Sequence, residues 1–75
     1  MAIRTATLNG VATIELARPQ KKNAITGEMY GALAAAFEQA TVDATVRAVL
    51  LTGQPDIFSS GNDVEDFLKR PPHAD

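Results

Sequence analysis

Apolar and polar side chains alternate in two short runs at the start of the chain, and Asn9-Gly10 separates them. Both central residues of a type I′ turn need a positive φ, which the Asn-Gly pair meets well. The pattern therefore predicts a β-hairpin with strands at 3–8 and 11–17. In the second strand, one face should be buried (Ala12, Ile14, Leu16) and the other partly exposed (Val11, Thr13, Glu15).

A helix is predicted over residues 27–42, with Thr26 as its N-cap and Glu28 in the first turn, where a carboxylate complements the helix dipole. Apolar side chains recur there at helical spacing, which predicts one buried stripe. The predicted stripe consists of Met29, Leu33, Ala36, Phe37 and Ala40. Away from it should lie Glu28, Ala32, Ala35 and Gln39.

The nearly continuous apolar run at 46–52 predicts a strand buried on both faces, as in a parallel sheet covered by helices. A hairpin, a helix and this strand give a ββαβ order of the α/β class. Ile57 and Phe58 should then return to the core. The loop at 53–62 follows the carboxyl end of the strand, where ligands bind in open α/β sheets. Asp63 should N-cap a short last helix, which Arg70-Pro71-Pro72-His73 should end, leaving 70–75 as a disordered tail.

The turn Ser59-Ser60-Gly61-Asn62-Asp63 carries the candidate chemistry. Gly61 can adopt a positive φ at little steric cost, which lets successive backbone N–H groups converge on a developing negative charge. Such an arrangement is one half of an oxyanion hole. The alternative, which composition alone favours, is an ordinary polar loop with a capping aspartate.

Composition excludes several classes of function. Seven basic and nine acidic residues give a net charge of −2 without a basic stripe, which argues against a nucleic-acid-binding face. The apolar runs are far shorter than the about 20 residues that span a bilayer, so no membrane insertion is expected. The absence of cysteine leaves no zinc site or disulfide to propose, and favours a cytoplasmic protein, or a peroxisomal one if a longer parent chain carries the address. The single histidine, His73, should be solvated.

Four motifs stand in register along the chain: Arg18-Pro19, Asn23-Ala24, the run at 46–53, and the turn at 58–63. In this order and spacing, nearly all 75 residues resemble the N-terminal part of the crotonase superfamily, which comprises enoyl-CoA hydratases and isomerases. The segment at 18–25, with Glu28-Met29-Tyr30 and the Ser-Ser-Gly-Asn-Asp form of the turn, is similar to the 3,2-enoyl-CoA isomerase branch. The resemblance implies the N-terminal ββαβ portion of a ClpP/crotonase fold.

The resemblance also implies site residues. The backbone N–H of Asn62 should donate to the thioester oxygen of an acyl-CoA substrate, with Gly61 setting the geometry of the turn. The implied acyl-CoA-binding positions are Ala24, Ser59, Ser60, Gly61, Asn62 and Asp63. Lys21 or Lys22 would meet the CoA phosphates, although lysines in a polar loop are commonly just solvated. Many hydratases carry alanine where Asn62 stands, which favours an isomerase, and no cofactor beyond the acyl-CoA substrate is implied.

Members of this family are several times longer, with a second oxyanion donor and an acid/base carboxylate further along. Glu28, Glu38 and Glu65 do not stand at that carboxylate's position. We therefore expect residues 1–75 to form one partial domain, an N-terminal fragment without turnover of its own. It should associate with the remaining portion or form a homo-oligomer, as family trimers and hexamers do. Two alternatives are a hydratase fragment and a non-enzymatic assembly module that uses its sheet edge and alanine-rich helix.

Overall fold

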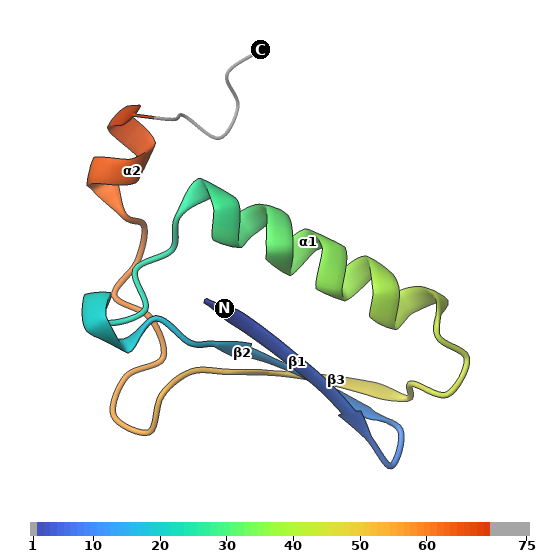
Figure 1. Ribbon diagram of the computed structural model, residues 1–75. Coiled ribbons are helices and arrows are strands. Elements are labelled where there is room, and N and C mark those ends of the chain that lie inside the picture. The colour runs from blue at the N-terminus through green and yellow to red at the C-terminus, as the bar shows by residue number, and fades with distance from the viewer. Residues whose placement is uncertain (1, 70–75) are drawn as a thin grey trace.

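The computed structural model describes residues 2–69, which form one layer of sheet with a long helix across it (Figure 1). The elements follow the predicted ββαβ order, with a loop and a short helix at the end. They are β1 (Ile3–Leu8), β2 (Val11–Leu16), a short 3-10 helix (Pro19–Lys21), α1 (Gly27–Val42), β3 (Ala48–Thr52) and α2 (Val64–Lys69). The predicted helix end and tail at 70–75, which include His73, lie outside the described residues.

The predicted hairpin is confirmed. β1 pairs antiparallel with β2, from Ile3 opposite Leu16 to Leu8 opposite Val11. Asn9 and Gly10 have φ values of 52° and 82°, the positive values that a type I′ turn requires. β2 ends at Leu16, one residue earlier than predicted, but the Ala17 N–H still donates to the Ala2 carbonyl at 2.7 Å.

β3 pairs parallel with β2, so the sheet order is β1-β2-β3 and α1 provides the crossover. The strand starts at Ala48, two residues later than predicted, because the preceding backbone is bonded elsewhere. The Val46 N–H donates to the Asp43 carbonyl at 3.1 Å, and the Arg47 N–H donates to the Gly10 carbonyl at 2.7 Å. The carboxyl ends of β2 and β3 therefore lie at the same edge of the sheet.

α1 has the predicted bounds and the predicted cap, because the Thr26 hydroxyl accepts a hydrogen bond from the Met29 N–H at 3.1 Å. It lies over one sheet face and closes a small core formed by Ile3, Ile14, Leu16 and Met29. The buried face predicted for β2 is confirmed, since all three of its residues are buried.

The predicted stripe of α1 is wrong at two positions. Ala32 packs against the core, because it lies three residues after Met29 and four before Ala36 and so shares their face. Phe37 is 40% exposed, although Leu33, one turn earlier on the same side of the helix, still packs against the core.

The prediction that β3 is buried on both faces is also wrong. Val49, Leu50 and Leu51 are 41%, 53% and 39% exposed. Val49 and Leu51 are in register with Ala12 and Ile14, so they extend the core face sideways, beyond the strands that α1 mainly contacts. Leu50 lies on the opposite face of the sheet. Phe58 does not return to the core either, because the loop after β3 leaves its side chain exposed.

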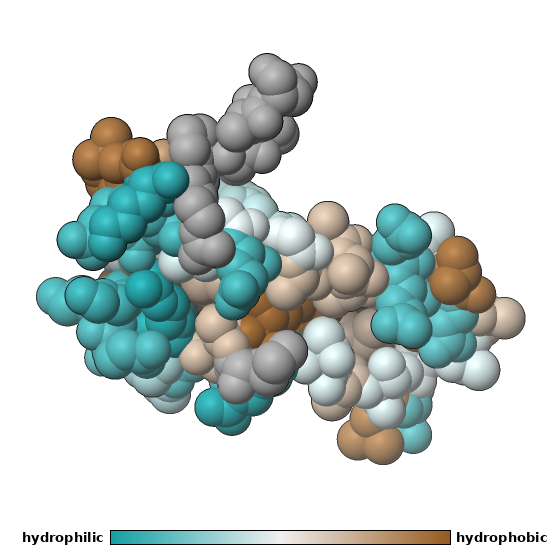
Figure 2. Space-filling view, turned by 45° about the horizontal axis from the view of Figure 1, so that its top comes forward, coloured by the Kyte–Doolittle hydropathy of each residue, from teal (hydrophilic) through white to brown (hydrophobic). Residues whose placement is uncertain are grey.

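Other apolar side chains reach the surface as well, and brown areas in separate places mark part of this surface in Figure 2. Neither helix in residues 2–69 combines the length and the hydropathy that a membrane span requires.

Candidate functional site

Two loops meet beyond the carboxyl ends of the parallel strands. Residues 18–25 join β2 to α1, and residues 53–63 join β3 to α2. They are held together by a one-residue parallel bridge between Ile25 and Asn62. The Ile25 N–H donates to the Gly61 carbonyl and the Asp63 N–H donates to the Ile25 carbonyl, both at 2.8 Å. The Ser60 N–H adds a bond to the Lys22 carbonyl at 3.0 Å.

This bridge decides where the Asn62 N–H points. The Gly61–Asn62 peptide group is planar and trans, so its C=O and N–H point in opposite directions. Because the carbonyl end is bonded to Ile25, the N–H end is directed away from Ile25. Within residues 2–69 no acceptor is bonded to it, and Asn62 is exposed. The bridge thus presents one unused backbone donor at the surface.

Gly61 has a φ of 105°, which confirms the positive φ predicted for this turn. Its own N–H donates to the Ser59 hydroxyl at 3.1 Å, and that hydroxyl donates to the Asn23 carbonyl at 2.9 Å. Apart from Gly61 and its two chain neighbours, no atom of residues 2–69 lies within 4 Å of the place where a Cβ would stand. Glycine is therefore required here by backbone conformation and not by lack of space.

Asn23 ties the two loops together from the inside. Its carboxamide is completely buried, accepts a bond from the Arg18 N–H at 2.6 Å and donates to the Phe58 carbonyl at 2.9 Å. Its φ is 57°, a left-handed conformation that asparagine tolerates better than most residues. Asn23 belongs to one of the four sequence motifs, but this role was not predicted for it.

Arg18 links the same two loops through its guanidinium. Nη1 donates to the Ala24 carbonyl at 2.9 Å and to the Asp63 carboxylate at 2.8 Å. The Arg18 and Asp63 side chains are only 18% and 14% exposed, so this ion pair is largely shielded from water. Arg18 was not predicted as a site residue, because its partner lies 45 residues away and no local pattern marks the pair.

Asp63 also caps α2 as predicted, since its carboxylate accepts the Asp66 N–H at 2.9 Å. This backbone hydrogen bond, followed by the bond from Arg18, lowers the pKa of Asp63 below its ordinary value, and the charge of Lys21 adds to the effect. Asp63 is therefore ionised at neutral pH. Asp66 in turn accepts the Gly27 N–H at 2.8 Å, which fixes α2 to the first turn of α1.

The Asn62 side chain is occupied by α1. The Tyr30 hydroxyl donates to its Oδ1 at 2.7 Å, and the Tyr30 ring stacks on Phe67 of α2, with ring centres 6.0 Å apart. Tyr30 was not predicted as a site residue. The Tyr-Asn contact joins residues 32 positions apart.

The structure brings the other predicted positions to the same place. Ala24 is partly buried beside the bridge, and Ser59 lies inside the turn while Ser60 is exposed. Lys21 and Lys22 are both exposed at the surface of the first loop, where they could meet an anionic group. Across the part of the chain that the structure describes, no cluster of side chains is suited to a metal ion.

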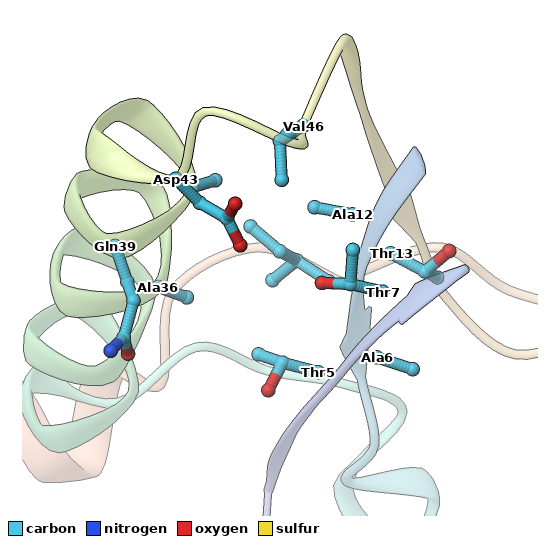
Figure 3. Close-up of a pocket in the computed structure, with 11 residues that line it drawn as sticks. Thr5, Ala6, Thr7, Ala12, Thr13, Ala36, Gln39, Asp43 and Val46 are labelled. Atoms are coloured by element: carbon cyan, nitrogen blue, oxygen red, sulfur yellow. The ribbon is translucent and has the colours of Figure 1, made fainter. Parts of the chain in front are cut away.

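A separate cavity of about 270 Å³ lies between the sheet and the C-terminal half of α1 (Figure 3). Thr5 and Thr7 of β1, Gln39 of α1, and Asp43 and Val46 beyond it lie around this space. Its lining contains no residue of the two loops at 18–25 and 53–63, so it is not part of the predicted site.

Known proteins match this chain over most of its length. The family described as enoyl-CoA hydratase/isomerase matches residues 6–75. This chain belongs to that family. Its ββαβ unit is part of a crotonase-like fold, since an enoyl-CoA hydratase/isomerase of Pseudoalteromonas atlantica superposes on 91% of this chain and 27% of its own, with a TM-score of 0.86 and 40% identity.

Family membership covers more than one reaction. Enoyl-CoA delta isomerase 2 of Homo sapiens is 44% identical over 64 residues, which are 85% of this chain and 16% of the human protein. A 4-chlorobenzoyl coenzyme A dehalogenase of Arthrobacter is 40% identical over 63 residues, or 84% of this chain and 23% of the dehalogenase. The chain thus spans less than a third of the length of each of these proteins.

Proposed function

We propose that this chain provides half of the acyl-CoA site of an enoyl-CoA isomerase. The observation that carries the proposal is the Asn62 N–H, which points outward from the turn and is bonded to no acceptor among residues 2–69. It would donate to the thioester oxygen of the substrate, with Gly61 supplying the turn that aims it. The CoA portion would lie along Ala24, Ser59, Ser60 and Asp63, with Lys21 or Lys22 near its phosphates.

The reaction moves a double bond from position 3 to position 2 of the acyl chain. A base removes a proton from the carbon next to the thioester carbonyl, and the electrons shift to give an enolate with its negative charge on the thioester oxygen. The proton then returns two carbons along. A fixed N–H donor at that oxygen contributes about 3–4 kcal/mol to stabilising the charge. The reaction as proposed needs no cofactor.

We place the acid/base carboxylate and the second N–H donor outside these 75 residues. Glu28, Glu38 and Glu65 are exposed to solvent, and the carboxylates nearest the turn already serve as hydrogen-bond acceptors for backbone N–H groups. Asp63 is held in its ionised form by Asp66 and Arg18. The chain alone should therefore bind an acyl-CoA thioester weakly and turn over little or none.

Two other functions remain as alternatives. A hydratase would use the same oxyanion donor, and the family description includes both reactions. The Asn62 side chain, held by Tyr30 beside the donor, favours the isomerase because many hydratases carry alanine at this position. A non-enzymatic assembly module is favoured by the exposed apolar side chains of β3. Either enzyme would act as an oligomer or together with the remaining part of a family subunit.

The test compares two ligands that differ in one oxygen. Butyryl-CoA has the thioester carbonyl, whereas S-butyl-CoA is the thioether that lacks it. The wild-type chain should bind butyryl-CoA more tightly by about 2- to 10-fold, the contribution of one hydrogen bond. Asn62→Pro removes the N–H, and the only hydrogen bond that it breaks within residues 2–69 is that of the Asn62 side chain with Tyr30. It should abolish this preference.

Asn62→Ala is the matched control, because it loses the same contact with Tyr30 but keeps the N–H. It should retain the preference for butyryl-CoA. In a longer protein that also carries the base, Asn62→Pro should lower kcat by about 10²-fold and Asn62→Ala should leave most activity. Loss of the preference in Asn62→Ala, or double-bond migration catalysed by the purified 75-residue chain, would contradict the proposal.

A further inference from the structure

The guanidinium of Arg18 stands at the start of a continuous line of hydrogen bonds that ends at the Asn62 N–H. Arg18 Nη1 donates to the Ala24 carbonyl at 2.9 Å. The other end of that peptide group, the Ile25 N–H, donates to the Gly61 carbonyl at 2.8 Å. The Gly61 carbonyl belongs to the Gly61–Asn62 peptide group, whose other end is the Asn62 N–H. Two peptide groups therefore lie head to tail between a positive charge and the proposed oxyanion donor.

This order of donors and acceptors has an electrical consequence. Each peptide group is a dipole, and a charge that bonds to its carbonyl draws electron density toward that end and makes the N–H at the other end a stronger donor. Hydrogen bonds in such chains strengthen one another. The Arg18 side chain is 18% exposed, so water screens its charge only in part.

The Asp63 carboxylate keeps the guanidinium in place from the opposite side. It accepts from the same Nη1 at 2.8 Å, and its negative charge offsets part of the field of Arg18. The offset is incomplete, because the Asp63 carboxylate is also bonded to the Asp66 N–H, and the Ala24 carbonyl, like the carboxylate, contacts Nη1 directly. The two acceptors are on the residues next to Ile25 and Asn62, so the ion pair also holds the bridge in register.

We propose that Arg18 is a positioning residue that orients and polarises the Asn62 N–H through the Ala24–Ile25 and Gly61–Asn62 peptide groups. Arg18 itself does not touch the substrate. The inference rests on the proposed function, because it assumes that the Asn62 N–H receives a thioester oxygen. It adds a charged group that acts on the oxyanion from two peptide groups away.

The experiment changes the charge at position 18 and measures how the C=O stretch of the bound ligand responds. Butyryl-CoA labelled with ¹³C at the carbonyl is bound to the 75-residue chain, and its C=O stretch is measured by isotope-edited infrared spectroscopy. Arg18→Gln keeps an N–H donor but removes the charge. In this variant the frequency of the ligand C=O stretch should move toward the value that it has in water. The preference of the Arg18→Gln variant for butyryl-CoA over S-butyl-CoA should be roughly 2- to 5-fold smaller than that of wild type, since charge-assisted bonds are about twice as strong as neutral ones.

Arg18→Lys restores the charge and should recover part of both effects, which a role in packing alone would not require. Arg4→Gln is the matched control, because Arg4 is an exposed arginine that pairs with Glu15 at 3.9 Å on the hairpin. It should change neither readout. Equal carbonyl frequencies and equal ligand preferences in wild type and Arg18→Gln would overturn the inference while leaving the proposed function intact.

Two further outcomes are decisive. If both Arg18 variants fail to fold, the wild-type chain still tests the relay, because the effect is reciprocal. Binding of butyryl-CoA, but not of S-butyl-CoA, should then shift the Ile25 amide proton downfield, and an unmoved Ile25 signal would refute the relay. If wild type shows no preference for the thioester, the proposed function and this inference both fail.

Discussion

At the scale of single residues, Gly61 and Gly31 differ mainly in backbone conformation. A Cβ built on either glycine would meet no atom within 4 Å, but Gly61 has a φ of 105° and Gly31 lies within α1. Gly61→Ala should therefore strain the turn and lower the free energy of unfolding by about 1 kcal/mol or more. Gly31→Ala should raise it by about 0.5–1 kcal/mol, because alanine has the higher helix propensity.

Thermal or urea unfolding of the two variants measures this difference directly. Because strain at Gly61 also displaces the Asn62 N–H, Gly61→Ala should lose the preference for butyryl-CoA, while Gly31→Ala keeps it. Unchanged stability in Gly61→Ala would mean that the turn relaxes to a negative φ.

At the scale of elements, the ionised Asp63 carboxylate contributes to the attachment of α2, next to the contacts of Asp66 and Phe67 with α1. The pKa of Asp63 lies below its ordinary value of 3.8 because the Asp66 N–H, and then Arg18, stabilise the charged form. A carboxyl group with a lowered pKa in the folded chain adds stability above its unfolded pKa, and this stability is lost as the pH falls through the folded pKa. We expect α2 to loosen as the pH falls below 3.8 toward the lowered pKa of Asp63 in the folded chain.

The amide signal of Asp66, followed by NMR during acid titration, reports this event locally. Asp63→Asn keeps a good N-cap without a titrating group, so it should remove the transition at Asp66. Asp43 is the control, because bonds from the Thr45 hydroxyl and N–H also lower its pKa, but at the end of α1. If Asp43→Asn, and not Asp63→Asn, removed the transition at Asp66, the assignment would be wrong.

At the scale of the whole molecule, β3 is the least covered element. Its three large apolar side chains are about two-fifths to one-half exposed, and α1 covers the sheet mainly over β1 and β2. Exposed apolar surface next to a free strand edge promotes association. We expect the 75-residue chain to self-associate, with a sedimentation coefficient that rises with concentration.

A single charge added to the sheet face opposite α1 tests which surface is responsible for self-association. Leu50→Lys places an ammonium group at the most exposed of the large apolar residues of β3 and should shift the equilibrium toward monomer without changing the circular dichroism spectrum. Val42→Lys adds the same charge at a 77% exposed valine at the end of α1 and should leave association unchanged. A wild-type chain that stays monomeric at all concentrations would contradict the prediction.

Most of the fold could be predicted from the sequence, because its signals are local. Four features each depend on residues that are near one another in the sequence. They are the Asn9-Gly10 turn, the bounds of α1, the positive φ of Gly61 and the cap at Asp63. The motifs at 18–24 and 58–63 indicated the family for the same reason, since their residue types and spacing can be read along the chain. The backbone part of the candidate site could therefore be predicted from the sequence.

The tertiary structure alone decided which of these local elements touch. An apolar run predicts that β3 can be buried, but its exposure depends on whether a neighbour covers it, and α1 leaves it open. Phe37 and Phe58 are exposed for a similar reason. The contacts of Asn23, Arg18 and Tyr30 with the turn join residues 35, 45 and 32 positions apart, and no local pattern encodes such a distance. The sequence by itself determined the turn that offers the Asn62 N–H, whereas packing of the two loops determined its direction, because only the bond between Ile25 and Gly61 fixes the peptide plane.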